Sequence, residues 1–118
     1  MKARALLGEF RDAEFIGEIF GLRSTYIILR TEKHYILITQ SGPLSGNFNL
    51  VTRRAVDAVQ RRFGGKRGLT SAEILRRSSV VKDRFDVLRI LYVLEALGQA
   101  KKRIAKPPGR GFVFDLKK

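Results

Sequence analysis

The chain has 118 residues, 44% of them hydrophobic and 30% charged, which is typical of one soluble domain, or of one domain with a small extension, and excludes a disordered tail. No apolar run approaches the roughly 18 residues of a membrane span, and the N-terminus lacks the order of a signal peptide, so we expect a cytoplasmic protein. The absence of cysteine excludes disulfides and thiolate metal sites, and with His34 as the one histidine we expect neither a metal nor a cofactor.

Positive charge is concentrated in the second half of the chain. The sequence holds 24 Lys and Arg residues against 11 Asp and Glu residues, a net charge of +13. Residues 1–50 carry 6 basic and 5 acidic residues, whereas residues 51–118 carry 18 basic and 6 acidic residues. Such a field attracts a polyanion, and because Arg outnumbers Lys we favour nucleic-acid phosphates over a membrane surface. The alternative is a basic surface kept for solubility.

The first half of the chain predicts a small β-sheet. Residues 1–12 are expected to form a short helix or arm. Three runs rich in Ile, Phe, Tyr and Thr follow, and we expect them to form a three-stranded antiparallel meander. These strands are residues 14–20, 25–31 and 34–39. Residues 40–49 contain Ser-Gly-Pro and Ser-Gly-Asn and are predicted to be a loop.

The second half predicts three helices and a β-hairpin. Thr52 caps the first helix, and Asp83 caps the third. Between them, Thr70 and Glu73 form a capping box that starts a short second helix. The helices are expected over about residues 53–63, 71–77 and 84–97. The hairpin strands are expected at residues 99–104 and 112–116, around a tip shaped by Pro and Gly.

This order of helix, short capped helix, turn, longer helix and basic hairpin resembles the winged helix-turn-helix superfamily over about residues 52–116. The positions that carry the resemblance are Ile74, Leu75, Val81, Val87, Leu91, Leu94, Gly98, Phe112 and Phe114. We therefore predict an α+β fold: a winged helix-turn-helix of three helices plus a β-hairpin wing, preceded by a small antiparallel β-meander. The meander would be an N-terminal extension, residues 1–49, and the winged helix-turn-helix domain would span residues 50–118.

The resemblance implies that the third helix enters the major groove of DNA and that the hairpin, the wing, touches the backbone or the minor groove. Basic side chains on the hairpin and the three helices would supply phosphate contacts. Any reading of bases would come from Arg84 and Arg89. The predicted nucleic-acid-binding residues are Arg54, Arg61, Arg62, Arg76, Arg77, Lys82, Arg84, Arg89, Lys101, Lys102, Arg103, Lys106 and Arg110. For each of them the alternative is a surface ion pair or a solvated side chain.

The third helix departs from the pattern of a recognition helix, because it is apolar nearly all round. One stripe consists of Val87, Leu91 and Leu94, and a second, on the opposite side, consists of Phe85, Leu88 and Tyr92. Such a helix is buried. We expect either the N-terminal meander or a second copy of the chain to cover it.

Signals for an enzyme are weak. Residues 63–68 lack the spacing of a P-loop, and His34 stands without a nucleophile. The acidic residues near the N-terminus are predicted to be solvated; they are Glu9, Asp12, Glu14 and Glu18. For the aromatic residues of the first half we predict core packing rather than base stacking; they are Phe15, Tyr26, Tyr35 and Phe48.

The sequence thus predicts a non-catalytic nucleic-acid-binding protein. The expected partner is duplex DNA, bound by a homodimer at the nucleoid as a transcriptional regulator or chromatin-associated protein, with no small-molecule ligand. Two alternatives stay open. One is an RNA-binding or ribosome-associated protein with the same fold, and the other is a protein-interaction module that uses the apolar third helix.

Overall fold

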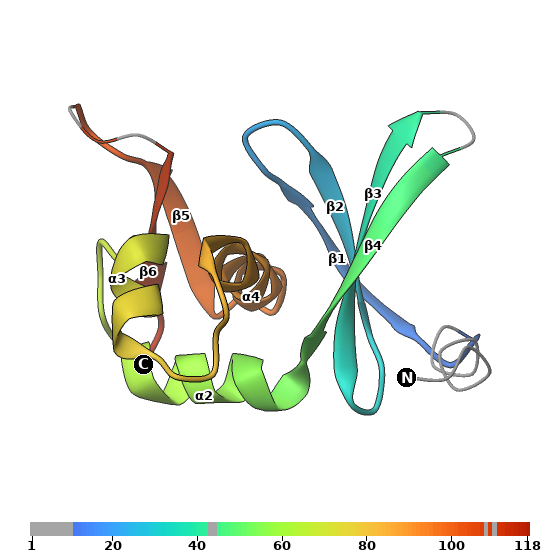
Figure 1. Ribbon diagram of the computed structural model, residues 1–118, viewed down its shortest axis with the longest axis horizontal. Coiled ribbons are helices and arrows are strands. Elements are labelled where there is room, and N and C mark those ends of the chain that lie inside the picture. The colour runs from blue at the N-terminus through green and yellow to red at the C-terminus, as the bar shows by residue number, and fades with distance from the viewer. Residues whose placement is uncertain (1–10, 43–44, 108, 110) are drawn as a thin grey trace.

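The computed structural model describes residues 11–42, 45–107, 109 and 111–118; the helix or arm predicted over residues 1–12 lies almost wholly outside them. The described residues form a four-stranded sheet, three helices and a two-stranded hairpin (Figure 1). The elements are β1 (Glu14–Phe20), β2 (Thr25–Arg30), β3 (His34–Gly42), β4 (Ser45–Thr52), α2 (Arg53–Phe63), α3 (Ser71–Arg77), α4 (Arg84–Ala96), β5 (Ala100–Ile104) and β6 (Phe112–Leu116).

The N-terminal sheet is antiparallel with strand order β1-β2-β3-β4. Only three of these four strands were predicted from the sequence. The loop predicted over residues 40–49 is wrong for most of its length, because β3 extends to Gly42 and β4 begins at Ser45. Strand β4 pairs with β3 through Ile36 and Leu50, and through Ile38 and Phe48. This pairing satisfies backbone N–H and C=O groups on the second edge of β3. That gain outweighs the low strand propensity of Gly and Asn in β4.

The three helices begin where their caps predict. The side-chain oxygen of Thr52 accepts a hydrogen bond from the N–H of Ala55 at 3.1 Å. In the same way, Thr70 caps α3 and Asp83 caps α4. Each cap satisfies an N–H group that the first helical turn leaves without a partner. The hairpin β5–β6 also forms over the predicted residues and pairs from Ala100–Leu116 to Ile104–Phe112.

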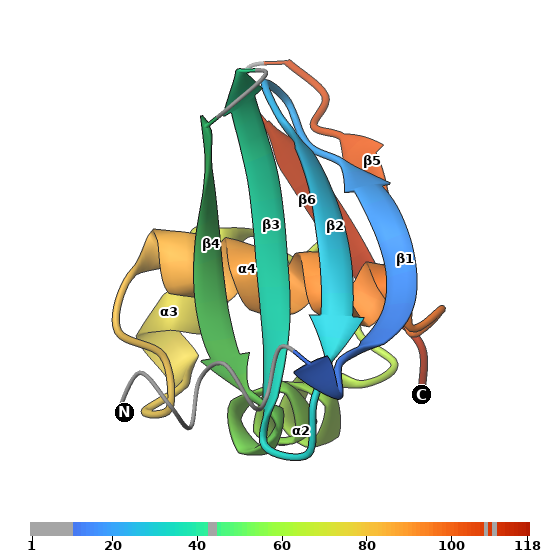
Figure 2. The same cartoon turned by 90° about the vertical axis from the view of Figure 1, so that its right-hand side faces the viewer.

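Helix α4 lies at the centre of the molecule. In Figure 1 it is seen end-on, between the four-stranded sheet and the layer made by α3 and the hairpin. Figure 2 shows that it runs across the back of the sheet. Close contacts support this: a Cβ on Gly17 of β1 would lie 3.5 Å from the Cβ of Ala96, and the rings of Tyr26 and Tyr92 have centroids 5.0 Å apart. From the sequence, either the N-terminal strands or a second copy of the chain was expected to cover α4. In the structure the chain's own sheet packs against it.

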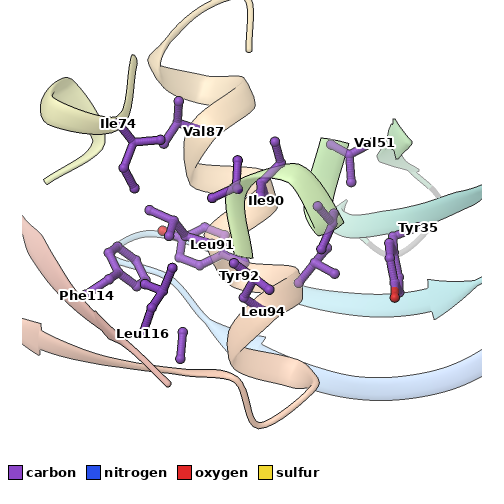
Figure 3. Close-up of a cluster of buried hydrophobic side chains, with 14 of the residues drawn as sticks. Tyr35, Val51, Ile74, Val87, Ile90, Leu91, Tyr92, Leu94, Phe114 and Leu116 are labelled. Atoms are coloured by element: carbon purple, nitrogen blue, oxygen red, sulfur yellow. The ribbon is translucent and has the colours of Figure 1, made fainter. Parts of the chain in front are cut away.

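One hydrophobic core is shared by all layers (Figure 3). Ile28 and Leu37 of the sheet belong to the same buried cluster as Leu91 of α4 and Phe114 of β6. The predicted fold class, a winged helix-turn-helix preceded by a small meander, is therefore wrong: the sheet has four strands and is a full layer of an α+β fold. The error has a physical cause, because α4 packs on the sheet, where Tyr92 contacts Tyr26, and the sheet is therefore part of the core and not an appendage to it.

The division into residues 1–49 and 50–118 stays a prediction. Strand β4 crosses that boundary and leads into α2 without a connecting loop. The start of α2 is also fastened to the β2–β3 turn, since the Arg53 N–H donates to the Lys33 carbonyl at 3.0 Å. The guanidinium of Arg53 donates to the carbonyl of Thr31 at 3.1 Å. No helix among the described residues is long and apolar enough to cross a membrane.

The two faces of the sheet make different contributions to stability, and β2 offers a matched pair of residues to test this. Ile28 is 0% exposed and faces α4, whereas its neighbour Ile27 is 41% exposed on the outer face. We expect Ile28→Ala to lower the free energy of unfolding by about 2–5 kcal/mol, because it leaves a cavity in the shared core. Ile27→Ala should cost less than about 1 kcal/mol. Urea unfolding measures both, and equal losses would contradict the packing of the sheet on α4.

Candidate nucleic-acid interface

The predicted residues on α2 and α3 are exposed, but the structure does not gather them all. Arg54 lies in the first turn of α2, whereas Arg61 and Arg62 lie in its last turn, roughly 10 Å further along the helix axis. Arg76 and Arg77 are exposed in the last turn of α3. Cations at the carboxyl end of a helix also interact favourably with the helix dipole. Exposure alone therefore does not distinguish a phosphate contact from a solvated side chain at these positions.

Two of the predicted hairpin contacts are occupied within the chain. The Nζ of Lys102 donates to Glu95 Oε1 of α4 at 2.5 Å and lies 5.3 Å from the centroid of the Phe112 ring. The guanidinium of Arg103 binds both carboxylate oxygens of Asp115, at 3.0 and 2.9 Å. These two residues therefore fasten the hairpin together and to α4. Arg110 lies outside the described residues.

Basic side chains do gather where the hairpin meets the end of α2. Two backbone hydrogen bonds join these segments, from Gly65 N–H to Leu116 O at 3.0 Å and from Leu116 N–H to Lys66 O at 2.9 Å. A third, from Lys117 N–H to Gln99 O at 2.9 Å, joins the two ends of the hairpin. We call the cations there the C-terminal basic cluster. It consists of Lys66, Arg67, Lys101, Lys117 and Lys118. The last four line one cavity, whereas Lys66 joins through its backbone and its Nζ lies 5.4 Å from the centroid of the Phe63 ring. The last turn of α2 adjoins it, because the side chain of Gln60 donates to the carbonyl of Lys117 at 2.7 Å.

The carboxylate beside this cluster is Asp115, and its charge is already compensated. Arg103 binds it from β5, and the N–H of Gly68 donates to its Oδ1 at 2.8 Å. The bond from Arg103, then that from Gly68, lowers the pKa of Asp115 to about 2. Asp115 thus orders the loop between α2 and α3 and leaves the five cluster cations without a competing ion pair among the described residues.

A second basic region lies over the exposed side of α4. Residues Val87, Ile90 and Leu91 are buried, whereas Arg84 and Phe85 are exposed at the start of the helix. The predicted insertion of this helix into a DNA major groove is therefore restricted to its first turns. Lys82 is exposed just before the helix, and its N–H donates to Asp86 Oδ2 at 3.1 Å.

Two adjoining cavities follow the exposed side of α4, with volumes of about 620 and 540 Å³. They share Leu22, Leu88 and Tyr92, and we call them together the α4 groove. The sheet and the β1–β2 turn form one wall, and the hairpin and the start of α3 form the other; the two walls flank α4 in Figure 1. The α4 groove brings together Arg23, Arg84, Arg89 and Lys106, of which sequence reasoning had selected the last three.

The β1–β2 turn is shaped by its packing against the groove floor. The N–H of Gly21 donates to the carbonyl of Ser24 at 2.8 Å. A Cβ on Gly21 would lie 3.0 Å from the Tyr26 ring and 3.3 Å from the Tyr92 hydroxyl, so a larger residue would displace the turn. Burial, with smaller effects of Tyr26 and Glu95, raises the pKa of Tyr92 to about 12. Its hydroxyl therefore stays protonated and able to donate at neutral pH.

Sequence reasoning missed several residues of both regions. Lys66, Arg67, Lys117 and Lys118 lie outside the helices and were assigned to no surface, although their adjacency in two basic pairs was a visible signal. Arg23 lies in the near-neutral half of the chain, and only the tertiary fold brings it beside α4. The aromatic prediction is confirmed for Tyr35, which is buried, and wrong for the exposed Phe15 and Phe48.

Comparison with family models, with curated proteins and with solved structures gave no significant match. The resemblance to the winged helix-turn-helix superfamily thus has no support from a relative. Among the described residues, no group of three His, Cys, Asp or Glu side chains is arranged to hold a metal ion.

Removal of the Asp115 charge should make the hairpin less stable in a pH-dependent way. Because its pKa is lowered in the folded protein, the stabilisation is complete above the ordinary pKa of an Asp and is lost as the pH falls towards 2. We expect Asp115→Asn to lower the Tm at pH 7, and the difference from the unmodified protein to shrink as the pH falls towards 2 and to vanish only below it. Asp57→Asn, which removes an exposed carboxylate from α2, is the control. Equal Tm values for the two variants at pH 7 would contradict a stabilising role of the Arg103 pair.

Proposed function

We propose that the protein binds nucleic acid without catalysis, by following a phosphate backbone with the C-terminal basic cluster. The observation that carries the proposal is the arrangement around Asp115. Four cations of the cluster line one cavity with Asp115, and Lys66 adjoins them through its backbone, while Arg103 and the Gly68 N–H already neutralise the carboxylate. A surface of one sign with its acid compensated attracts a polyanion.

Phosphate contacts suit this cluster better than base reading does. None of the five cluster residues lies in a helix, because they come from a loop and from the ends of strands. The cluster therefore has no helix of its own that could enter a major groove. Contacts of this kind give affinity and salt dependence with little sequence preference. Duplex DNA of any sequence is therefore the first partner to test, and a homodimer at the nucleoid belongs to the same proposal.

The alternative of an interaction module built on the apolar third helix has less support. Of its second stripe, Tyr92 is buried against Tyr26 of the sheet, Leu88 is half-buried, and only Phe85 is largely exposed. A partner that bound the whole stripe would have to displace the sheet from Tyr92.

The proposal is tested by the salt dependence of binding. We expect the double variant Arg67→Gln/Lys101→Gln to bind duplex DNA more weakly. The slope of log K against log salt should become shallower by about 0.9 for each phosphate that the variant no longer neutralises. Fluorescence anisotropy of a labelled duplex over a range of salt concentrations measures both quantities.

The control is Arg11→Gln/Lys33→Gln, which removes the same net charge from exposed positions of the sheet half. It should keep most of the affinity and the full slope. If the two double variants lose affinity and slope equally, binding follows net charge alone and the basic cluster is not the site.

A further inference from the structure

We propose that the α4 groove holds unpaired nucleotides of a single-stranded nucleic acid. This inference rests on the proposed nucleic-acid binding and adds the class of ligand. The basic cluster would attract the backbone of any nucleic acid, and the α4 groove would select strands whose bases are free. Three features of the groove support this: its size, its aromatic surface and its charge.

The size suits a short stretch of nucleotides. The two cavities, of about 620 and 540 Å³, each fall in the range of about 300–1,000 Å³ that is common for small-ligand pockets. They share Leu22, Leu88 and Tyr92. Leu22 lies at the boundary between them, because a Cβ on Gly111 of the hairpin loop would lie 3.9 Å from its Cδ1. A strand that occupied both cavities would therefore pass over Leu22.

The aromatic surface favours bases that have left a duplex. Phe85 is 68% exposed at the start of α4, and it lines the same cavity as Tyr26 and Tyr92, whose rings contact each other at a tilt of 34°. Stacking on a phenyl ring needs the flat face of a base, whereas a duplex presents only base edges and phosphates to a protein. An exposed ring in a basic groove therefore matches a single strand better than a double helix.

The charge of the groove matches a phosphate backbone. Arg23 and Arg89 line the cavity beside the sheet, and Arg84 and Lys106 line the cavity beside the hairpin. No Asp or Glu is among the described residues that line either cavity. The Nε of Arg84 donates to Ser71 Oγ at 3.4 Å, which orients the guanidinium at the groove while its terminal nitrogens stay available to a phosphate.

The outer face of the sheet lacks this combination. It also exposes an aromatic residue, Phe20, which is 64% exposed. The row of paired residues beside it consists of Glu18, Ile27, Ile38 and Phe48, so its one charged residue is acidic. The cavity on this face is lined by one cation, Arg23, and one carboxylate, Glu18, so it lacks the excess of positive charge of the α4 groove. Phe20 therefore provides a control for Phe85 of the same type and nearly the same exposure.

The first test compares Phe85→Ala with Phe20→Ala. We expect Phe85→Ala to weaken binding of a short oligo-dT strand roughly 5- to 100-fold, the range that corresponds to removal of one base–aromatic stack. It should leave binding of a duplex within about twofold of the unmodified protein, and Phe20→Ala should leave both unchanged. Anisotropy of labelled strands measures the affinities, and circular dichroism confirms that both variants are folded.

Two further probes separate bases from phosphates and DNA from RNA. An abasic strand of the same length carries the phosphates without the bases, so the unmodified protein should prefer oligo-dT to it and Phe85→Ala should lose that preference. An oligo-U strand tests whether the groove accepts RNA; stronger binding of oligo-U than of oligo-dT would identify RNA as the preferred single strand.

A second variant keeps the aromatic ring and reports on stacking directly. The chain contains no tryptophan, so Phe85→Trp introduces a single indole into the groove, which can be excited selectively over the three tyrosines. We expect oligo-dT to quench its emission, because a base stacks on the indole, and the abasic strand to quench it less. Phe20→Trp is the control and should show no quenching by either strand.

The outcomes distinguish the two proposals. If Phe85→Ala weakens single strands no more than Phe20→Ala does, while Arg67→Gln/Lys101→Gln still weakens binding, the groove proposal is overturned and the proposed function stands. Equal losses for single strands and duplex would also overturn the groove proposal. If the unmodified protein binds neither the duplex nor any of the single strands, both proposals are wrong.

Discussion

Burial of α4 on both sides is the constraint on which the rest of the structure depends. A helix with two apolar stripes needs two covering layers, and the chain supplies a sheet for one and the α2–α3–hairpin layer for the other. Contact with the sheet holds the β1–β2 turn against Tyr92. The same burial leaves only the start of α4 open, so the position of Phe85 and Arg84 in the groove follows from the packing of the core.

The placement of charge follows the same division. The sheet contributes mainly apolar residues, whereas the helices, loops and hairpin of residues 51–118 contribute 18 of the 24 Lys and Arg residues. Arg103 and Lys102 show that part of this charge is structural, because each is paired with a carboxylate that fastens the hairpin. The net charge therefore overstates the number of cations that are available to a ligand. The cations that have no carboxylate partner define where a phosphate backbone can bind.

Local signals in the sequence predicted the local structure well. Thr52, Thr70 and Asp83 placed the helix starts because a cap is decided by the residue itself and the three that follow. The fourth strand was missed because pairing with β3 outweighs the loop-like composition of the segment. The apolar stripes of α4 indicated that another element packs against the helix, but the helix sequence does not determine how many strands that element has. The groove is formed by residues that are distant in sequence, such as Arg23 and Lys106. The composition of the chain shows that such cations exist, but it does not show which of them lie together.

Thr52 ends β4 and at the same time caps α2, so the two layers meet without a linker. Residues of the sheet, α4 and the hairpin also belong to one buried cluster. A change in the separation of the two walls would expose part of that apolar surface to water, at a cost in free energy. A ligand that fits the walls at their present separation would avoid this cost, and less of its binding free energy would go into ordering the protein.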